Sequence, residues 1–176
     1  MAILETSRLI LVPTPRDVLE TRLERDAFSA TVALDGETMR VDFPAEWPGD
    51  ALVLVPMLLA HYDDSLWSGL ILAVDQATYV AVGAIGCKGP PDRAGAIEIG
   101  YGVNPTHCGR GYASEMVQAL AAWLLVQPGV RHVTAETSVD NPASIRVLEK
   151  SGFQRIGERV DAEDGPLFLW RLGPEA

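Results

Sequence analysis

The stretch IEIGYGVNPTHCGRGYASEM, residues 97–116, decides the fold. Alternating apolar residues from Ala96 to Val103 predict a β-strand, which the following Asn-Pro pair ends. A turn with glycines at 109 and 111 leads into a helix from Tyr112, whose apolar positions keep helical spacing. Such a turn forms an anion cradle, because glycine permits positive φ and the helix start presents unpaired N–H groups to a phosphate.

The spacing of these glycines excludes two common phosphate-binding motifs. No Gly-Lys-Ser/Thr follows at the distance that a P-loop needs. The dinucleotide motif G-x-G-x-x-G fails because Ser114 takes its third glycine position. On these residues alone, a plain strand-to-helix turn remains the alternative to an anion site.

Outward from this stretch, the patterns predict alternating strands and helices. Strands are expected at 8–13, 66–74, 78–88, 130–139, 153–160 and 167–172; helices from Pro15 through Phe28 with Thr14 as N-cap, at 51–62 with a kink at Pro56, and from 142 to Lys150; and a loop at 37–50. This order predicts an α/β fold with a mixed sheet and helices on its faces. No second domain boundary is evident, so residues 1–176 are expected to form a single domain.

The chain has 176 residues and a net charge of −10, from 14 Lys and Arg against 24 Asp and Glu. This acidity argues against binding to nucleic acids or to anionic membranes. It favours a cationic partner, and the alternative is that it serves only the solubility of the protein. Residues 1–66 carry 12 acidic and 5 basic side chains, so −7 of the charge lies there.

The cysteines and the apolar segments indicate the cellular compartment that we expect for the protein. Cys87 and Cys108 are 21 positions apart, with no Cys/His cluster, so neither a disulfide framework nor a metal site is expected. The start of the chain lacks the pattern of a signal peptide, and the longest apolar run, residues 51–60, is too short to cross a membrane. A cytoplasmic location is therefore expected.

Three segments resemble the GNAT superfamily of acyl-CoA-dependent N-acetyltransferases. Residues 97–116 resemble its motif A, and residues 141–153, NPASIRVLEKSGF, resemble its motif B. The start TSRLIL, residues 6–11, resembles the branch that contains ribosomal-protein N-terminal acetyltransferases. The resemblance implies a mostly antiparallel, twisted sheet of about seven strands with one splayed parallel pair, flanked by about four helices.

The resemblance also implies where acetyl-CoA binds, between the splayed strands 96–103 and 133–138. The residues it assigns to the cosubstrate are Tyr101, Gly102 and Val103 for the pantetheine arm, the backbone of Gly109, Arg110, Gly111, Tyr112 and Ala113 for the pyrophosphate, and Asn141 and Ser144 from the other side. Cys108 also belongs to this set, although the family usually has Arg or Gln there. That departure removes a side-chain donor, so weaker binding is expected.

Two residues are candidates for the chemistry. An amine must lose a proton before it attacks a thioester, and Glu98 lies where related enzymes carry a general base. The alternative for Glu98 is a solvated charge on the sheet. Ser144 matches a serine that could hydrogen-bond the CoA sulfur, or it could be a second helix cap. The usual tyrosine acid is excluded because Leu148 stands in its place.

The resulting prediction is an N-acetyltransferase that moves an acetyl group from acetyl-CoA to a primary amine. The acceptor would be a protein N-terminus or a small cationic amine, attracted by acidic residues of the N-terminal part. The candidates for this attraction are Asp42, Glu46, Asp50, Asp63 and Asp64. No metal is expected, and the chain would act as a monomer or homodimer. The alternative is a non-catalytic acyl-CoA-binding module of the same fold.

Overall fold

The structure is a computed structural model that describes residues 4–34, 36–62, 67 and 69–174. In this part, one sheet has the strand order β1-β2-β5-β6-β7-β8-β10-β9, and β3 and β4 form a separate pair. The strands are β1 (Leu4–Glu5), β2 (Leu9–Pro13), β3 (Phe28–Leu34), β4 (Glu37–Phe43), β5 (Gly69–Asp75), β6 (Ala81–Cys87), β7 (Ala96–Val103), β8 (His132–Ser138), β9 (Gln154–Asp161) and β10 (Gly165–Leu172). The helices are α1 (Arg16–Glu24), α2 (Val55–Ala60), α3 (Tyr112–Leu124) and α4 (Pro142–Lys150), with 3-10 turns η1 (Gly49–Leu54) and η2 (Pro105–His107).

The large sheet is antiparallel at every junction except one. Only β7 and β8 run parallel, and they pair over three positions, from Ala96 opposite His132 to Glu98 opposite Thr134. Beyond Glu98, β7 continues to pair with β6, and β8 continues to pair with β10. The two parallel strands therefore separate after Glu98, as the sequence resemblance implied.

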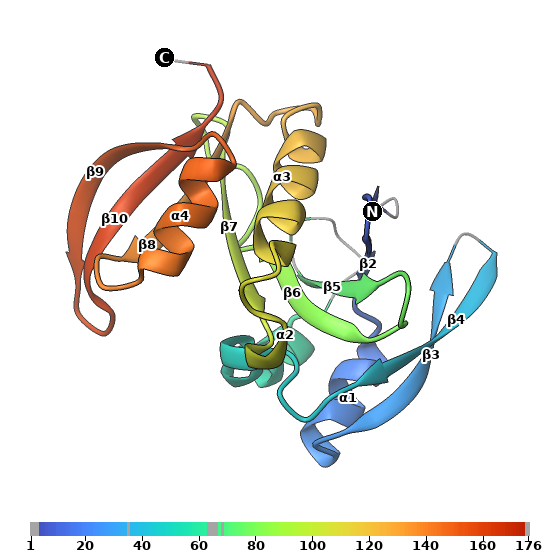
Figure 1. Cartoon of the computed structure of the whole chain (residues 1–176). Helices are drawn as coiled ribbons and strands as arrows, with labels where there is room; N and C mark the ends of the chain where they lie inside the picture. Colours follow the sequence, from blue (N-terminus) through green and yellow to red (C-terminus); the bar gives the residue numbers. More distant parts are fainter. Residues whose placement is uncertain (1–3, 35, 63–66, 68, 175–176) are drawn as a thin grey trace.

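The glycine turn and α3 occupy the positions that residues 97–116 predict. Ile97 and Ile99 point from β7 into a core that includes Met116 and Leu120 of α3, and all four are buried. Burial of one face of α3 against β2, β6 and β7 fixes the helix on the sheet. Figure 1 shows α3 in front of the sheet and α4 against the half built from β8, β9 and β10.

A second core covers the opposite face of the sheet. Leu72 and Val74 of β5 pack there with Val18, Leu19 and Trp47, which come from α1 and from the segment after β4. Each side of the sheet is thus apolar, because alternate residues of a strand point to opposite faces. The β3–β4 hairpin joins this second core and projects from the main sheet in Figure 1.

Two expectations for the N-terminal third are wrong. The predicted loop 37–50 contains strand β4, and Phe28 opens strand β3 instead of continuing the helix. Met39, Val41 and Phe43 alternate with polar residues and are buried, which is the pattern of a β-strand. The neighbouring Pro and Gly residues favoured a loop instead and led to the wrong prediction.

The helices of this third also begin differently from the prediction. Thr14 does not cap α1: the N-cap is Pro15 without a side-chain bond, and Thr14 Oγ1 is buried with no partner in the described chain. The predicted helix at 51–62 is the 3-10 turn η1 followed by α2, and Pro56 lies in the first turn of α2. Proline is tolerated there because first-turn N–H groups have no helical partner.

Candidate functional site

The glycine turn before α3 is built as an open anion cradle. Gly109 has φ of +75° and Gly111 has φ of +84°, which is the left-handed region that favours glycine. No hydrogen bond from the N–H groups of Gly109, Arg110 or Gly111 occurs among the described residues. A Cβ at Gly109 would meet nothing within 4 Å, so the outer face of the turn is free. Consecutive free N–H groups at a helix start suit the pyrophosphate of CoA.

Side chains of the turn contribute less to this cradle than its backbone. Cys108 Sγ turns back toward the carbonyl oxygens of Val103, at 3.7 Å, and Asn104, at 3.6 Å. Arg110 Nη2 donates to Thr106 O at 3.1 Å, which closes the turn beneath the cradle. The Cys108 side chain therefore adds no donor to the cradle, while Arg110 leaves a cation beside it.

The register of β7 determines which main-chain groups line the split between β7 and β8. Lys88 N donates to Glu98 O and Asn104 N donates to Val82 O, so the even-numbered residues of β7 bond to β6. The N–H groups of Tyr101 and Val103 then face the free edge, because donors alternate along a strand. Of the predicted pantetheine contacts, the Gly102 N–H is directed at β6.

Tyr101 connects the two sides of the split on the α4 face. Its hydroxyl donates to Ser144 O at 3.2 Å, and burial raises the pKa of Tyr101 to about 12. Asn141 caps α4 by accepting from Ser144 N at 3.0 Å. Ser144 thus gives its N–H to the cap, while no hydrogen bond of its hydroxyl is seen in the described chain. Leu148 is fully buried in the core.

Glu98 lies at the point where β7 and β8 part. Its neighbours Ile97 and Ile99 face the α3 core, so its side chain points to the opposite face, and it is 33% exposed. The carboxylate forms an ion pair with Lys88, which follows β6. Lys88 is not among the residues predicted from the sequence, although opposite charges on facing strands could have indicated it. Glu136 of β8, bound by Arg159 at 2.6 Å, was also missed.

The acidic N-terminal residues are spread over several places. Asp42 is exposed and accepts from Ser29 Oγ at 2.6 Å within the β3–β4 hairpin. Glu46 accepts from Thr106 Oγ1 and lies 3.7 Å from His107 Nδ1, next to the cradle. Asp50 is exposed on η1, and η1 contacts β7. Two further candidates, Asp63 and Asp64, lie outside the described residues.

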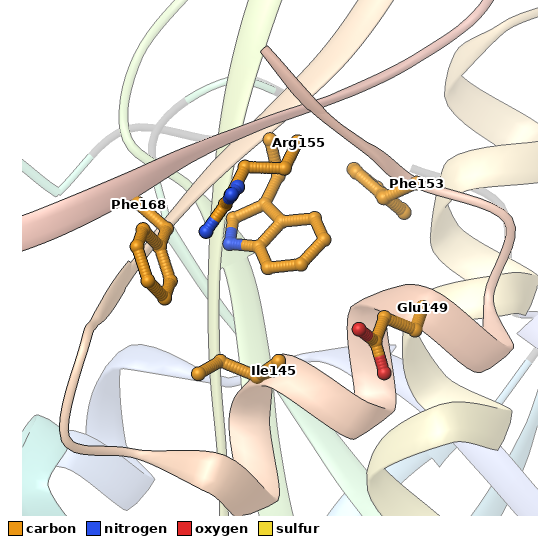
Figure 2. A pocket seen from close by; sticks show the side chains of 6 residues that line it. Ile145, Glu149, Phe153, Arg155 and Phe168 are labelled. Atoms are coloured by element: carbon orange, nitrogen blue, oxygen red, sulfur yellow. The ribbon is translucent and has the colours of Figure 1, made fainter. Parts of the chain in front are cut away.

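A separate hollow of about 460 Å³ lies between α4 and the strands β9 and β10. Figure 2 shows Ile145 and Glu149 on α4 facing Phe168 and Arg155 across it. The Arg155 guanidinium is 4.5 Å from the centre of the Phe168 ring. None of the residues predicted to hold CoA lines this hollow.

Comparison with known proteins identifies the family. The profile of the acetyltransferase (GNAT) domain matches residues 8–154. The chain belongs to the GNAT acetyltransferase family. It is 32% identical over 157 residues to the uncharacterized N-acetyltransferase YjdG of Bacillus subtilis, covering 87% of this chain and 90% of that protein. This acetyltransferase therefore uses acetyl-CoA as its acyl donor.

Solved GNAT structures share the fold. The ribosomal L7/L12 alpha-N-protein acetyltransferase RimL, in complex with coenzyme A, superposes with a TM-score of 0.69 at 16% identity, covering 97% of each chain. A chimera of the spermidine N-acetyltransferase SpeG from Vibrio cholerae superposes with a TM-score of 0.67 at 16% identity, covering 94% of this chain and 95% of that one.

The described part of this GNAT chain shows neither a membrane-spanning helix nor a metal-binding cluster. Its described helices include none that is long and apolar enough to cross a bilayer. The same residues contain no group of three or more His, Cys, Asp or Glu side chains that could hold a metal ion.

Proposed function

We propose that this GNAT protein transfers the acetyl group of acetyl-CoA to a cationic primary amine, either a small molecule or a peptide N-terminus. The observation that carries the proposal is the open cradle of free N–H groups at 109–111, next to a split whose free edge includes the Val103 N–H. A diphosphate fits the cradle, and an extended arm with amide groups fits the strand edge as an added strand would.

In this proposal Glu98 is the general base. Acetyl-CoA supplies the thioester, and an amine attacks its carbonyl carbon only after losing a proton. The two-thirds buried carboxylate of Glu98 lies where the strands part and takes that proton, directly or through a water molecule. The Lys88 ammonium ion, held against the Glu98 carboxylate, repels the cationic acceptor amine. Lys88 must therefore leave the carboxylate, or shift together with it, when the amine binds.

The leaving group and the oxyanion have candidate donors nearby. We assign the Tyr101 N–H to the oxyanion, because β7 directs it into the split, between Val103 and Glu98, and backbone donors stabilise such a charge. Ser144 lies on the opposite side of the split, and its hydroxyl is free to donate to the CoA sulfur. A CoA thiolate is a good leaving group, so Ser144 contributes less to the rate than Glu98 does.

The choice of a cationic acceptor rests on charge and on relatives. The first 66 residues carry −7, and Asp50 lies on η1, which contacts the strand of Glu98. RimL and SpeG are named for acetylating a protein N-terminus and spermidine, both of which are amines. We also propose that residues 1–176 form one domain, since both cores share the same sheet.

Mass spectrometry of the reaction products tests this function. The protein is incubated with deuterium-labelled acetyl-CoA and, separately, with spermidine, an aminoglycoside and a peptide with a free N-terminus. Labelled N-acetyl product is expected with at least one of these amines, together with calorimetric binding of CoA. Binding of CoA without product from any amine would favour a non-catalytic acyl-CoA-binding module. Absence of both would reject the proposal.

A further inference from the structure

The segment ahead of β2 reaches the cradle through Arg8. Arg8 Nη1 donates to Arg110 O at 2.9 Å, a bond between residues 102 positions apart. The guanidinium carbon of Arg8 lies 4.7 Å from the centre of the Tyr112 ring. A Cβ on Gly111 would be 3.4 Å from Arg8 Nη2, so the guanidinium packs directly against the cradle.

Glu115, in the first turn of α3, holds Arg8 in this position. Its Oε2 accepts from Arg8 Nε at 2.8 Å and from Arg8 Nη2 at 2.6 Å. Its Oε1 accepts from Thr6 Oγ1 at 2.5 Å, Ser7 Oγ at 3.1 Å and Arg8 N at 2.9 Å. Burial alone would raise the pKa of Glu115, but these hydrogen bonds lower it below its usual value. The carboxylate is therefore charged at neutral pH and anchors the guanidinium.

The Tyr112 ring beside Arg8 is fixed from its other end. Its hydroxyl donates to Asp75 Oδ2 at 2.6 Å, and the hydrogen bond to Asp75 raises the pKa of Tyr112. Asp75 is itself held by Ala77 N at 3.1 Å and Thr78 N at 3.0 Å. Arg8 is thus clamped between a fixed carboxylate and a fixed ring.

The hydrogen bond from Arg8 to Arg110 O also fixes the direction of the Gly111 N–H. The carbonyl of residue 110 and the N–H of residue 111 belong to one planar trans peptide and point in opposite directions. Holding the Arg110 carbonyl toward Arg8 therefore directs the Gly111 N–H away from Arg8, on the side where none of the described residues accepts it. In a glycine-containing turn this peptide could otherwise rotate at little cost.

We propose that Arg8 is a positioning residue for CoA, which fixes the 110–111 peptide so that the Gly111 N–H faces the diphosphate. The inference rests on the proposed function, since it needs CoA to occupy the cradle. Arg8 acts through the backbone, because its own charge is satisfied by Glu115. This role also suits a cradle in which Cys108 supplies no side-chain donor.

Calorimetric titration with CoA tests the role of Arg8 in the variants Arg8→Gln and Arg8→Lys. Losing one aligned donor is worth about 1.4 kcal/mol, so Arg8→Gln is expected to raise the Kd for CoA about tenfold. Lysine can hold only part of the contacts, so Arg8→Lys should give an intermediate Kd. In steady-state assays, KM for acetyl-CoA should rise by the same factor while kcat stays within twofold. Arg16→Gln, which removes an exposed ion pair to Glu20, serves as the matched control and should leave both values unchanged.

A second titration, with dephospho-CoA, separates the diphosphate from the 3′-phosphate. Dephospho-CoA keeps the diphosphate, so Arg8→Gln should weaken it by the same factor as CoA. If only CoA were weakened, Arg8 would bind the 3′-phosphate directly and the inference would be overturned. Unchanged CoA affinity, or a fall in kcat at constant KM, would also overturn it. If Arg8→Gln fails to fold, as circular dichroism would report, the Arg8→Lys titration decides. Failure of the wild-type protein to bind CoA would instead overturn the proposed function, and this inference with it.

Discussion

At the scale of single residues, Glu98 carries the proposed chemistry. It is partly buried where β7 and β8 part, and its one cationic partner in the described chain, Lys88, comes from a neighbouring strand end. Glu98→Gln is isosteric but cannot accept the amine proton. We expect kcat to fall by roughly 10²- to 10⁴-fold, the range for loss of a general base, with the Kd for CoA unchanged.

A matched variant controls for the change of charge. Glu158→Gln removes an exposed carboxylate on β9, which among the described residues pairs only with Arg155, at 3.8 Å, and should retain wild-type kcat. A Glu98→Gln variant as active as Glu158→Gln would show that Glu98 is a solvated charge on the sheet.

Substitutions of Asn141 and Ser144 distinguish a helix-capping role from a role in the reaction. Asn141→Ala removes the acceptor for Ser144 N and should lower the free energy of unfolding by about 1 kcal/mol, as for other N-caps. Ser144→Ala keeps that N–H, so we expect little loss of stability in urea denaturation. A several-fold fall in kcat for Ser144→Ala would then support donation to the CoA sulfur. A loss of stability equal to that of Asn141→Ala would mean that the hydroxyl is a second cap.

At the scale of elements, the hairpin β3–β4 depends on Trp47. Its indole is fully buried, meets the Phe43 ring edge-on at 4.8 Å and donates from Nε1 to Gly83 O at 3.1 Å. Trp47→Ala should lower the free energy of unfolding by about 3–5 kcal/mol in urea denaturation, the usual cost of truncating a buried aromatic. Val53→Ala, at an exposed position on η1, should cost almost nothing. Similar costs for the two variants would contradict this packing.

The β9–β10 turn predicts a specific pH dependence. Hydrogen bonds from Glu163 N at 3.0 Å and from Arg159 Nη1 at 2.6 Å lower the pKa of Asp161 to about 2, from an ordinary 3.8. The folded chain therefore binds this proton more weakly than the unfolded chain, so the contribution is complete above about pH 4 and is lost as the pH falls toward 2. Asp161→Asn should lower Tm at pH 7, and the difference from wild type should shrink below pH 4.

Asp140→Asn is the control for the turn. Asp140 is exposed, and its carboxylate makes no hydrogen bond within the described chain, so its Tm difference should stay near zero at every pH. A constant Tm difference for Asp161→Asn across this pH range would contradict the assigned pKa.

Elements with strong local signals could be predicted from the sequence. Strand β7, the cradle and α3 follow from apolar periodicity and two glycines, and Asn141 before Pro142 indicates the start of α4. Strand β4 was missed because Pro44 and Pro48 suggested a loop, although its alternation was visible. The contact of Arg8 with Glu115 joins residues 107 positions apart, so no local pattern could have indicated it.

At the scale of the whole molecule, backbone N–H groups explain how an acidic chain could bind an anionic cosubstrate. A chain with a net charge of −10 can bind a polyanion through free N–H groups at a helix start, and residues 109–111 supply such groups in the proposed CoA site. The remaining acidity is concentrated in the first 66 residues and suits a cationic acceptor. The free N–H groups at 109–111 therefore suit the anionic CoA, whereas the acidic N-terminal part suits a cationic acceptor.

The most direct test of this account measures CoA release from acetyl-CoA with two amines of opposite charge, spermidine and an aspartate-rich peptide with a free N-terminus, at low and high salt. We expect kcat/KM to be at least tenfold higher for spermidine at low salt, since complementary charge speeds association. That preference should decrease at high salt because salt screens exposed charges. Faster turnover of the acidic peptide, or no CoA release with either amine, would contradict the proposed transfer to a cationic amine.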